Sequence, residues 1–366
     1  MTALAEHVTP QQADRTVSER EFLTRVEQRL ETFLGDRCRV LRDVGPDLEP
    51  IARTVHDLAR GGKRLRASFC YWGWRGAGAD DLDAAVDAAA SLELFHLGAL
   101  VHDDLMDHSA TRRGLPTAHE SFADVHRTDG FDGDATDFGS NAALLVGDLC
   151  LTWSDELLDG CDAEPSRHAA ARRVFHLMRS QVMAGQYLDM LEQARPGTTP
   201  AASTAVLHFK SAKYTVEHPL LLGGALAGAS DALSAAYSEF GLPIGEAFQL
   251  RDDVLGVFGD PAVTGKPVGD DLREGKKTVL VLVATERADD RQRRLLADGL
   301  GDRGLAEQGV RDLQTVLTDT GALDEVERRI TDLTARGTAA IRSSEVPGPV
   351  ADGLTDLAVR IAGRAA

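Results

Sequence analysis

The chain has 366 residues, of which 43% are hydrophobic and 27% are charged, a balance typical of a folded protein rather than of a disordered or membrane one. The formal net charge of −18 argues against a nucleic-acid partner and requires that any anionic ligand bind through metal ions or a local basic cluster. The apolar stretches are too short to span a bilayer and no basic, apolar leader is visible, so we expect a cytoplasmic enzyme without stable membrane insertion.

Apolar residues recur at three- and four-residue spacing through nearly every segment, which predicts an all-α protein. Residues 1–18 are polar and lack a sustained period, so we expect a disordered tail there and a single all-α domain over 19–366. A Gly/Asp-rich loop is expected at 127–137. The predicted helices cover 20–36, 48–60, 63–76, 81–108, 138–159, 164–194, 201–228, 231–258, 276–288, 304–319, 321–344 and 348–364.

The segment Gly61-Gly-Lys-Arg-Leu-Arg66 is expected to open a helix. Backbone N–H groups at a helix N-terminus, together with three cations, can converge on an anion. The segment lacks the GxxxxGK[ST] spacing and follows no strand, so it is not a P-loop. A basic helix start without a ligand is the alternative.

The helix at 81–108 is apolar until it ends in three carboxylates, Asp103, Asp104 and Asp107. Residues four apart share a helix face, so Asp103 and Asp107 project together. Neighbouring carboxylates repel unless a cation lies between them, and their hard oxygens suit magnesium, which also binds substrate phosphates. A solvated helix end is the alternative for this pattern alone. His96, about two turns earlier on the same face, could donate to a second phosphate or be a core histidine.

Two arginines and a glycine, Arg112, Arg113 and Gly114, follow the aspartates closely. Arginine forks bind phosphate through two hydrogen bonds, and a metal-bridged diphosphate needs both acidic and basic clusters. The combined pattern DDxxDxxxxRRG is therefore far more specific than either half.

A second acidic pair, Asp252 and Asp253, lies on another apolar, helical segment, where a merely structural charge would be costly. Downstream, the Gly-rich turn that begins at Gly265-Lys266 adds the carboxylates Asp270 and Asp271 and the lysine Lys276. This turn could form a phosphate lid, or it could simply be solvated.

With these motifs in the order found, residues 48–290 resemble a trans-isoprenyl diphosphate synthase of the geranylgeranyl diphosphate synthase type. The resemblance implies an isoprenoid-synthase-like all-α bundle around a central cavity, in a homodimer, with the two aspartate clusters facing each other. It also implies condensation of isopentenyl diphosphate with an allylic diphosphate, dimethylallyl, geranyl or farnesyl, by magnesium-assisted ionisation.

The resemblance assigns each site residue a role. About three magnesium ions per site would be held by carboxylates, in keeping with the oxygen ligands that this ion prefers, and these carboxylates are Asp103, Asp104, Asp107, Asp252, Asp253 and Asp271. The allylic diphosphate would contact Arg112, Lys210, Ser211, Gln249, Lys266 and Lys276. The isopentenyl diphosphate would contact Gly62, Lys63, Arg66, His96 and Arg113. Gln186 and Asp189 match polar residues that line the cavity.

The second cluster departs from the family pattern, because Gly256 replaces the last aspartate of a full DDxxD. Ser211 stands where threonine is more frequent. Asp252, Asp253 and Asp271 can still supply ligands, so we expect catalysis to survive.

Product length should depend on side chains upstream of Asp103 on the same helix face. Gly98 and Ala99 are small and would let a growing chain pass, whereas Phe95, roughly 12 Å deeper by helical rise, is the first bulky candidate to stop it. We therefore expect mainly the twenty-carbon geranylgeranyl diphosphate. Shorter (farnesyl) or longer products remain open if another helix sets the length.

Two other classes compete with this interpretation. A class I terpene cyclase would share the fold and one aspartate cluster but needs an (N/D)DxxSxxxE motif, which DDVLGVFGD lacks. A non-catalytic partner subunit usually loses aspartates from the first cluster, which is intact here.

Overall fold

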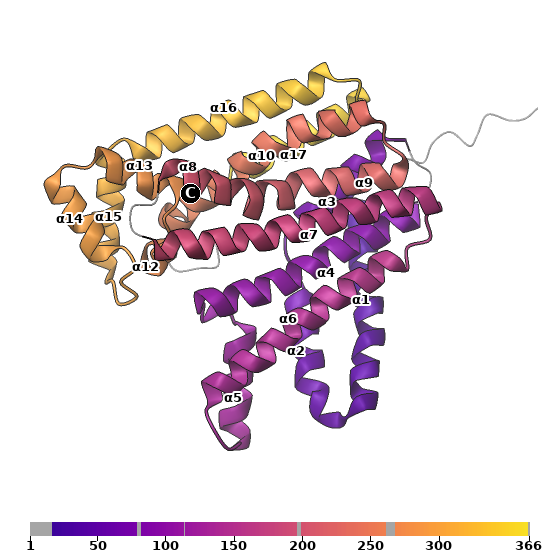
Figure 1. The fold of residues 1–366 in the computed structure, drawn as a ribbon, viewed down its shortest axis with the longest axis horizontal. Helices are drawn as coiled ribbons and strands as arrows, with labels where there is room; N and C mark the ends of the chain where they lie inside the picture. Colours follow the sequence, from indigo (N-terminus) through magenta and orange to yellow (C-terminus); the bar gives the residue numbers. More distant parts are fainter. Residues whose placement is uncertain (1–16, 79–81, 113, 196–198, 261–267, 365–366) are drawn as a thin grey trace, which may run out of the picture.

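The computed structural model describes residues 17–78, 82–112, 114–195, 199–260 and 268–364. Within these residues it is helical except for one short hairpin, which confirms the all-α fold (Figure 1). The predicted tail lies almost entirely outside the described residues. The helices are α1 (Glu19–Val44), α2 (Glu49–Ala59), α3 (Leu65–Gly76), α4 (Leu82–Asp107), α5 (Ala118–Asp129), α6 (Ala135–Asp159), α7 (Pro165–Ala194), α8 (Pro200–Val206), α9 (His218–Ala227), α10 (Asp231–Phe258), α12 (Asp270–Glu274), α13 (Val279–Arg287), α14 (Asp290–Gly299), α15 (Glu307–Asp319), α16 (Ala322–Ser343) and α17 (Gly348–Ala362), with the 3₁₀ turn η1 (Pro46–Leu48) and the π-helix η2 (Leu207–Glu217).

Helix α4 forms the centre of the largest core cluster. It is apolar on nearly every side, and such a helix is stable only when other elements surround it. Helices α1, α3, α5, α6 and α9 pack against it. By length and composition alone α4 could span a membrane, but 78% of its apolar window is buried inside the protein.

A second group of helices packs around α10 and includes α12, α13, α16 and α17. Helices α10 and α16 pack along each other at the top of Figure 1, and α13 to α15 close the left-hand end. Helix α6 diverges from α7 after the turn that joins them, and α5 extends away from the body. The ends of α4 and α10, which carry the two acidic clusters, therefore lie in different groups of helices.

The π-helix η2 continues α8 and leads into α9, and it lies wedged between α7 and α10. Three glycines allow this close approach. A Cβ at Gly185 of α7 would lie 2.5 Å from the backbone nitrogen of Lys210, and one at Gly245 of α10 would lie 2.5 Å from Cα of Ala212. A Cβ at Gly241 of α10 would meet the next turn of η2 at 2.9 Å. The backbone of η2 is thus fixed directly beside the acidic end of α4.

Several predicted boundaries were wrong. The loop predicted at 127–137 is present but shorter, at 130–134, since α5 ends at Asp129 and α6 begins at Ala135. The helix expected from residue 63 begins at Leu65, because Arg64 adopts a left-handed conformation with φ of 49°. Helices α5 and α14 were not predicted from the sequence. Helix α14 is strongly polar, and it begins with a capping box at Asp289 that local pattern could have revealed.

Candidate functional site

The three aspartates at the end of α4 have different environments. Asp104 is only 4% exposed, and both of its carboxylate oxygens accept hydrogen bonds from Nε of Arg112, at 2.8 and 2.7 Å. Arg112 lies in the hairpin formed by β1 (Thr111–Arg112) and β2 (Leu115–Pro116), where Gly114 turns with φ of 76°. Asp104 stays a predicted metal ligand; in this structure its carboxylate binds Arg112, while the side chains of Asp103 and Asp107 are more exposed than that of Asp104.

Lys210 reaches the first cluster from η2. Its Nζ lies 3.2 Å from Asp103 and 2.6 Å from Asp189 on α7. Burial alone would raise the pKa of Asp103, but the charges of Lys210 and its cationic neighbours outweigh burial and lower the pKa. The predicted cavity residue Gln186 lies nearby, with its amide 3.9 Å from the sulfur of Met106.

Lys276 joins the two halves of the site. Its Nζ lies 3.6 Å from Asp107 of the first cluster, 3.5 Å from Asp271 and 2.6 Å from Glu274. Burial opposes the charge on Lys276, yet these carboxylates raise its pKa well above the usual value. Asp107 and Asp271 therefore approach the same ammonium group, and a small cation in its place could contact both.

The second cluster lies on the last turns of α10. Asp252 forms an ion pair with Arg364 near the end of the chain, at 2.8 Å. Asp253 is 9% exposed and accepts a hydrogen bond from the amide of Gln249 at 2.8 Å. Gln249 was expected to contact the allylic diphosphate, and it lies one turn from this carboxylate.

The glycine that interrupts the second DDxxD motif has a packing reason. A Cβ at Gly256 would lie 1.9 Å from Oδ2 of Asp271. The carboxylate of Asp271 thus fills the space into which a side chain at position 256 would project. The acidic group that the motif lacks at this helix position comes instead from α12.

Two of these carboxylates hold protons unusually strongly. Burial, followed by the charge of Asp103, raises the pKa of Asp107 to about 6. Burial also raises the pKa of Asp253 to about 7, and the charges of Asp271 and Asp252 add to that effect. A cation bound here would stabilise the ionised forms.

The carboxylates of the site suit magnesium if substrate phosphates complete the coordination of the ion. No three acidic, histidine or cysteine side chains of the described residues lie close enough to hold a metal ion by themselves. Magnesium usually takes one or two carboxylates and completes its shell with substrate phosphates and water. The carboxylates fit this requirement, because Asp103, Asp107 and Asp271 already bind cationic nitrogens from neighbouring segments.

A separate basic group lies at the start of α3. Gly61 and Gly62 have φ of 74° and 96°, and Arg64 has φ of 49°. This left-handed turn precedes the helix and presents Lys63 and Arg66. Among the described residues, neither of these two cations has a carboxylate oxygen within the 4.0 Å of an ion pair.

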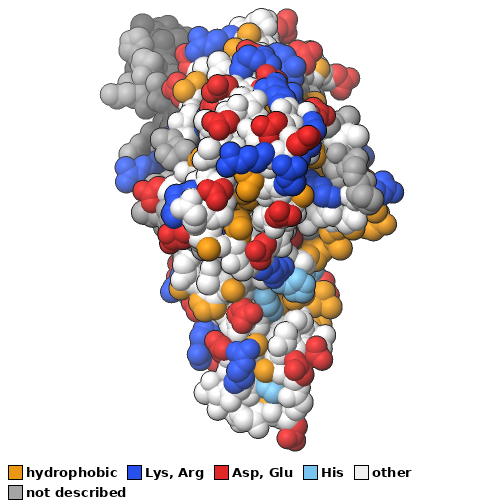
Figure 2. Space-filling model, turned by 90° about the vertical axis from the view of Figure 1, so that its left-hand side faces the viewer, with side chains coloured by type: hydrophobic (Ala, Val, Ile, Leu, Met, Phe, Trp, Pro, Cys, Tyr) orange, Lys and Arg blue, Asp and Glu red, His pale blue; other side chains and the backbone are white. Residues whose placement is uncertain are grey.

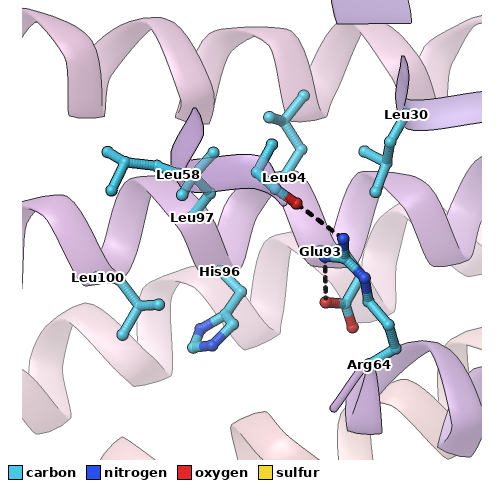
Figure 3. A pocket seen from close by; sticks show the side chains of 9 residues that line it. Leu30, Leu58, Arg64, Glu93, Leu94, His96, Leu97 and Leu100 are labelled. Atoms are coloured by element: carbon cyan, nitrogen blue, oxygen red, sulfur yellow. Dashed lines mark hydrogen bonds and ion pairs between the residues drawn. The ribbon is translucent and has the colours of Figure 1, made fainter. Parts of the chain in front are cut away.

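Glu93 fixes the turn from α4. It is 7% exposed and accepts hydrogen bonds from Nη1 of Arg64 at 3.4 Å and from the backbone N–H of Ala67 at 3.2 Å. The same pocket is lined by His96, one turn further along α4 (Figure 3). A buried carboxylate thus fixes the basic turn to α4, and His96, predicted for the same site, lines the same pocket.

The remaining predicted residues are placed as follows. Lys266 and Arg113 lie outside the described residues. Ser211 is half-buried in η2 beside Lys210. Phe95 is 1% exposed and Ala99 is partly exposed one turn nearer the aspartates. Gly98 does not face open space, because a Cβ there would lie 2.9 Å from a backbone oxygen of α6, so its small size serves helix packing.

Sequence reasoning missed several residues of the site. Glu93 could have been suspected as an acidic residue within an apolar helix. Glu274 stood in the predicted lid without an assigned role, and Arg364 gave no local signal because it meets Asp252 only through the packing of α17. The contacts of Glu93 with Arg64 and of Arg364 with Asp252 join segments distant in sequence.

The end of the molecule formed by α12 to α15 carries acidic and basic side chains side by side (Figure 2). The net charge of −18 therefore does not produce a field of one sign on this face. An anionic substrate can approach it without meeting a uniformly acidic surface.

Comparisons with known proteins converge on one family. The family model described as polyprenyl synthetase matches residues 49–317. A geranylfarnesyl diphosphate synthase of Aeropyrum pernix is 34% identical over 75% of this chain and 81% of its own. A (2E,6E)-farnesyl diphosphate synthase of Mycobacterium bovis is 35% identical over 64% of this chain and 60% of its own.

A solved structure gives the same result for the fold. The geranylgeranyl pyrophosphate synthase of Corynebacterium glutamicum, complexed with isoprenyl diphosphate and magnesium, superposes with a TM-score of 0.92 at 36% identity, covering 95% of this chain and all of that one. These relatives make products of different lengths.

Proposed function

The chain belongs to the polyprenyl synthetase family, and on that premise we propose that it is a prenyl diphosphate synthase that makes mainly geranylgeranyl diphosphate. It condenses isopentenyl diphosphate with dimethylallyl, geranyl or farnesyl diphosphate. The substrate chemistry is consistent with the isoprenyl diphosphate and magnesium in the Corynebacterium glutamicum structure.

The main support for the proposal is that the cations at the aspartate clusters pair with carboxylates, whereas those at the start of α3 do not. At the aspartate clusters, Lys210, Lys276 and Arg112 all pair with carboxylates. At the start of α3, Lys63 and Arg66 form no ion pair within 4.0 Å among the described residues, although the more distant charge of Asp252 acts on Lys63. A diphosphate can bind the second group directly, whereas the first needs additional cations.

We assign the allylic diphosphate to the aspartate side. About three magnesium ions, which prefer such oxygen ligands, would be held by Asp103, Asp104, Asp107, Asp252, Asp253 and Asp271. When bound, magnesium neutralises the charge that develops on the departing pyrophosphate. Lys210 contacts Asp103, and Lys276 contacts Asp107 and Asp271, so both lysines would orient the diphosphate oxygens. Arg112, Ser211 and Lys266 would also contact the diphosphate, as the family pattern implies.

The basic turn would hold the second substrate. Gly62, Lys63, Arg66, His96 and Arg113 bind the diphosphate of isopentenyl diphosphate and aim its double bond at the allylic carbon. The allylic C–O bond breaks, the double bond attacks the resulting carbocation, and a new C–C bond forms. The released pyrophosphate then accepts the proton that the product loses, so no side-chain base is required.

Phe95 is proposed as the floor that limits the product to twenty carbons. Its ring packs edge-on against Phe175 at 5.9 Å, and the guanidinium of Arg179 lies 5.9 Å from its centroid. Arg179 also pairs with Asp155, so α7 and α6 are tied together at this depth. Above it, Ala99 offers a small side chain. Farnesyl or longer products are the alternative outcome, as the names of the relatives allow.

A homodimer in the cytoplasm is proposed as the working form. Support comes from α6, which exposes Leu144 to 47% and Leu145 to 57%. Large apolar side chains exposed on one helix favour contact with a second copy. A mass of twice the chain in light scattering would agree, and a monomer at working concentration would contradict this part alone.

The test of the proposed function incubates the purified protein with magnesium, isopentenyl diphosphate and each of the three allylic primers, and identifies products by mass. We expect chain elongation ending mainly at geranylgeranyl diphosphate. Condensation with no primer would favour a non-catalytic subunit, and a cyclic hydrocarbon from a primer alone would favour a cyclase.

A matched pair of variants sharpens this assay. Asp103→Asn removes a carboxylate at the site, and Asp83→Asn removes an exposed one at the other end of α4. We expect the first to lose at least about 100-fold in kcat, because it weakens electrostatic stabilisation of the leaving group, and the second to stay near wild type. Equal activity of the two variants would contradict the assignment.

A further inference from the structure

Tyr214 lies in η2, four residues after Lys210, and is only 5% exposed. Its hydroxyl is 3.1 Å from Nδ1 of His96. Its ring lies under the guanidinium of Arg66, whose central carbon is 4.1 Å from the ring centroid. One side chain therefore contacts both Arg66 on α3 and His96 on α4.

The contacts that hold Arg66 are uncharged. Besides the ring of Tyr214, its Nη2 donates a hydrogen bond to the hydroxyl of Thr215 at 3.0 Å. Its Nε is buried and lacks a hydrogen-bond partner in the described structure. A carboxylate in this place would neutralise the guanidinium, whereas an aromatic face attracts a cation and leaves its charge available to an anion.

The hydroxyl of Tyr214 also stays neutral. Burial raises the pKa of Tyr214 to about 12, so at working pH the group can donate or accept a hydrogen bond without adding negative charge. The ring of Tyr214 is itself held in place, because the ring of Phe95 packs edge-on against it with a centroid distance of 5.8 Å. Neighbouring Ala212 is pressed against Gly245 of α10. The ring thus has little freedom to move.

We propose that Tyr214 is a positioning residue that holds Arg66 and His96 in the orientation needed to bind the diphosphate of the acceptor substrate. It acts through these two residues and does not itself touch the reacting atoms. The inference rests on the proposed function, since it concerns the isopentenyl diphosphate site. It also gives η2 two tasks, because Lys210 serves the aspartate side and Tyr214 the basic side.

Two variants separate the contributions of the residue. Tyr214→Phe keeps the ring beneath Arg66 and removes only the hydrogen bond to His96, so we expect KM for isopentenyl diphosphate to rise about fivefold. Tyr214→Leu removes both contacts, and we expect a rise of about 30-fold or more. In both variants KM for the allylic diphosphate and kcat should change by less than about twofold.

Tyr237→Phe is the matched control. Tyr237 is fully buried and donates a hydrogen bond to the backbone oxygen of Gly73 at 2.9 Å, in a core cluster formed with α17. Loss of this hydroxyl should lower the melting temperature without altering either KM. If Tyr214→Leu does not fold, Tyr214→Phe decides the question.

The inference is overturned if KM for isopentenyl diphosphate is unchanged in Tyr214→Phe. It is also overturned if KM for isopentenyl diphosphate and KM for the allylic diphosphate rise equally. If wild type condenses no substrate, the proposed function fails. Calorimetric titration of wild type and Tyr214→Phe with isopentenyl diphosphate then still tests the inference. The inference is supported if Tyr214→Phe binds isopentenyl diphosphate more weakly than wild type. It is rejected if the two proteins bind isopentenyl diphosphate equally, or if neither binds it.

Discussion

At position 256 a glycine replaces the last carboxylate of the second DDxxD motif, and another segment supplies a carboxylate in its place. The motif alone suggests that the second cluster has lost a ligand. In the structure the carboxylate of Asp271 occupies the space beside Gly256. Since that contact joins α10 to α12, it could not be predicted from helix periodicity, although the sequence analysis did include Asp271 in the ligand set.

Restoring the full motif should therefore harm the enzyme. In Gly256→Asp the new Cβ would lie 1.9 Å from Oδ2 of Asp271, and a second carboxylate would repel the first. We expect a loss of about 1–3 kcal/mol in the free energy of unfolding and a lower activity, measured by urea unfolding and by product formation. Gly256→Ala, which adds the clash without the charge, should lose less. A variant with more activity than wild type would show that Asp271 does not fill this role.

The raised pKa values of Asp253 and Asp107 predict a pH dependence of metal binding. Burial holds these pKa values at about 7 and about 6 in the metal-free protein. Below these values the carboxylates bind protons, and a magnesium ion must displace them. The apparent affinity for magnesium should fall as the pH decreases from about 8 to 6, by up to about tenfold per unit for each displaced proton. Calorimetric titration at several pH values measures this, and an affinity that is constant over the range would contradict it.

At the scale of elements, α4 was largely predictable and η2 was not. The apolar run before Asp103 specifies a buried helix by composition alone. By contrast, the region 201–228 was predicted as one regular helix, whereas Leu207–Glu217 form a π-helix that packs between α7 and α10. The local sequence pattern does not show that glycines of α7 and α10 face this segment. The first aspartate cluster was therefore easier to predict than the contacts of Lys210.

The wedge of η2 predicts the effect of filling one glycine. In Gly185→Ala the added methyl would lie 2.5 Å from the backbone nitrogen of Lys210, so η2 must shift and take the lysine with it. We expect about 1–3 kcal/mol of destabilisation and a kcat several-fold lower. Gly35→Ala in α1 meets nothing within 4 Å and should be neutral or slightly stabilising. If both variants behave alike, the close contact is not important.

The packing of α4 predicts the product spectrum of Phe95→Ala. Removal of the ring opens the proposed floor, so longer products than geranylgeranyl diphosphate should appear in an assay with labelled isopentenyl diphosphate. Because Phe95 also contacts Tyr214, KM for isopentenyl diphosphate must be measured in parallel. A rise in that KM with an unchanged product distribution would assign Phe95 to the acceptor site rather than to the floor.

At the scale of the whole molecule, the fold class followed from periodicity because almost every segment is an amphipathic or buried helix. Helix boundaries failed where special conformations intervene, as at Arg64, and where a polar helix begins with a capping box, as at Asp289. Grouping of the two aspartate clusters came from the family resemblance. The bridge through Lys276, which brings Asp107 and Asp271 to one point, required the structure.

The molecule is proposed to bind one diphosphate through metal ions and the other directly through Lys63 and Arg66, which form no close ion pair among the described residues. Calorimetric titration with isopentenyl diphosphate, and separately with a non-reactive thio analogue of an allylic diphosphate, each with magnesium or with EDTA, tests it most directly. We predict that EDTA weakens binding of the allylic analogue by at least about tenfold and leaves isopentenyl diphosphate nearly unaffected. Equal dependence of both ligands on magnesium would contradict the account.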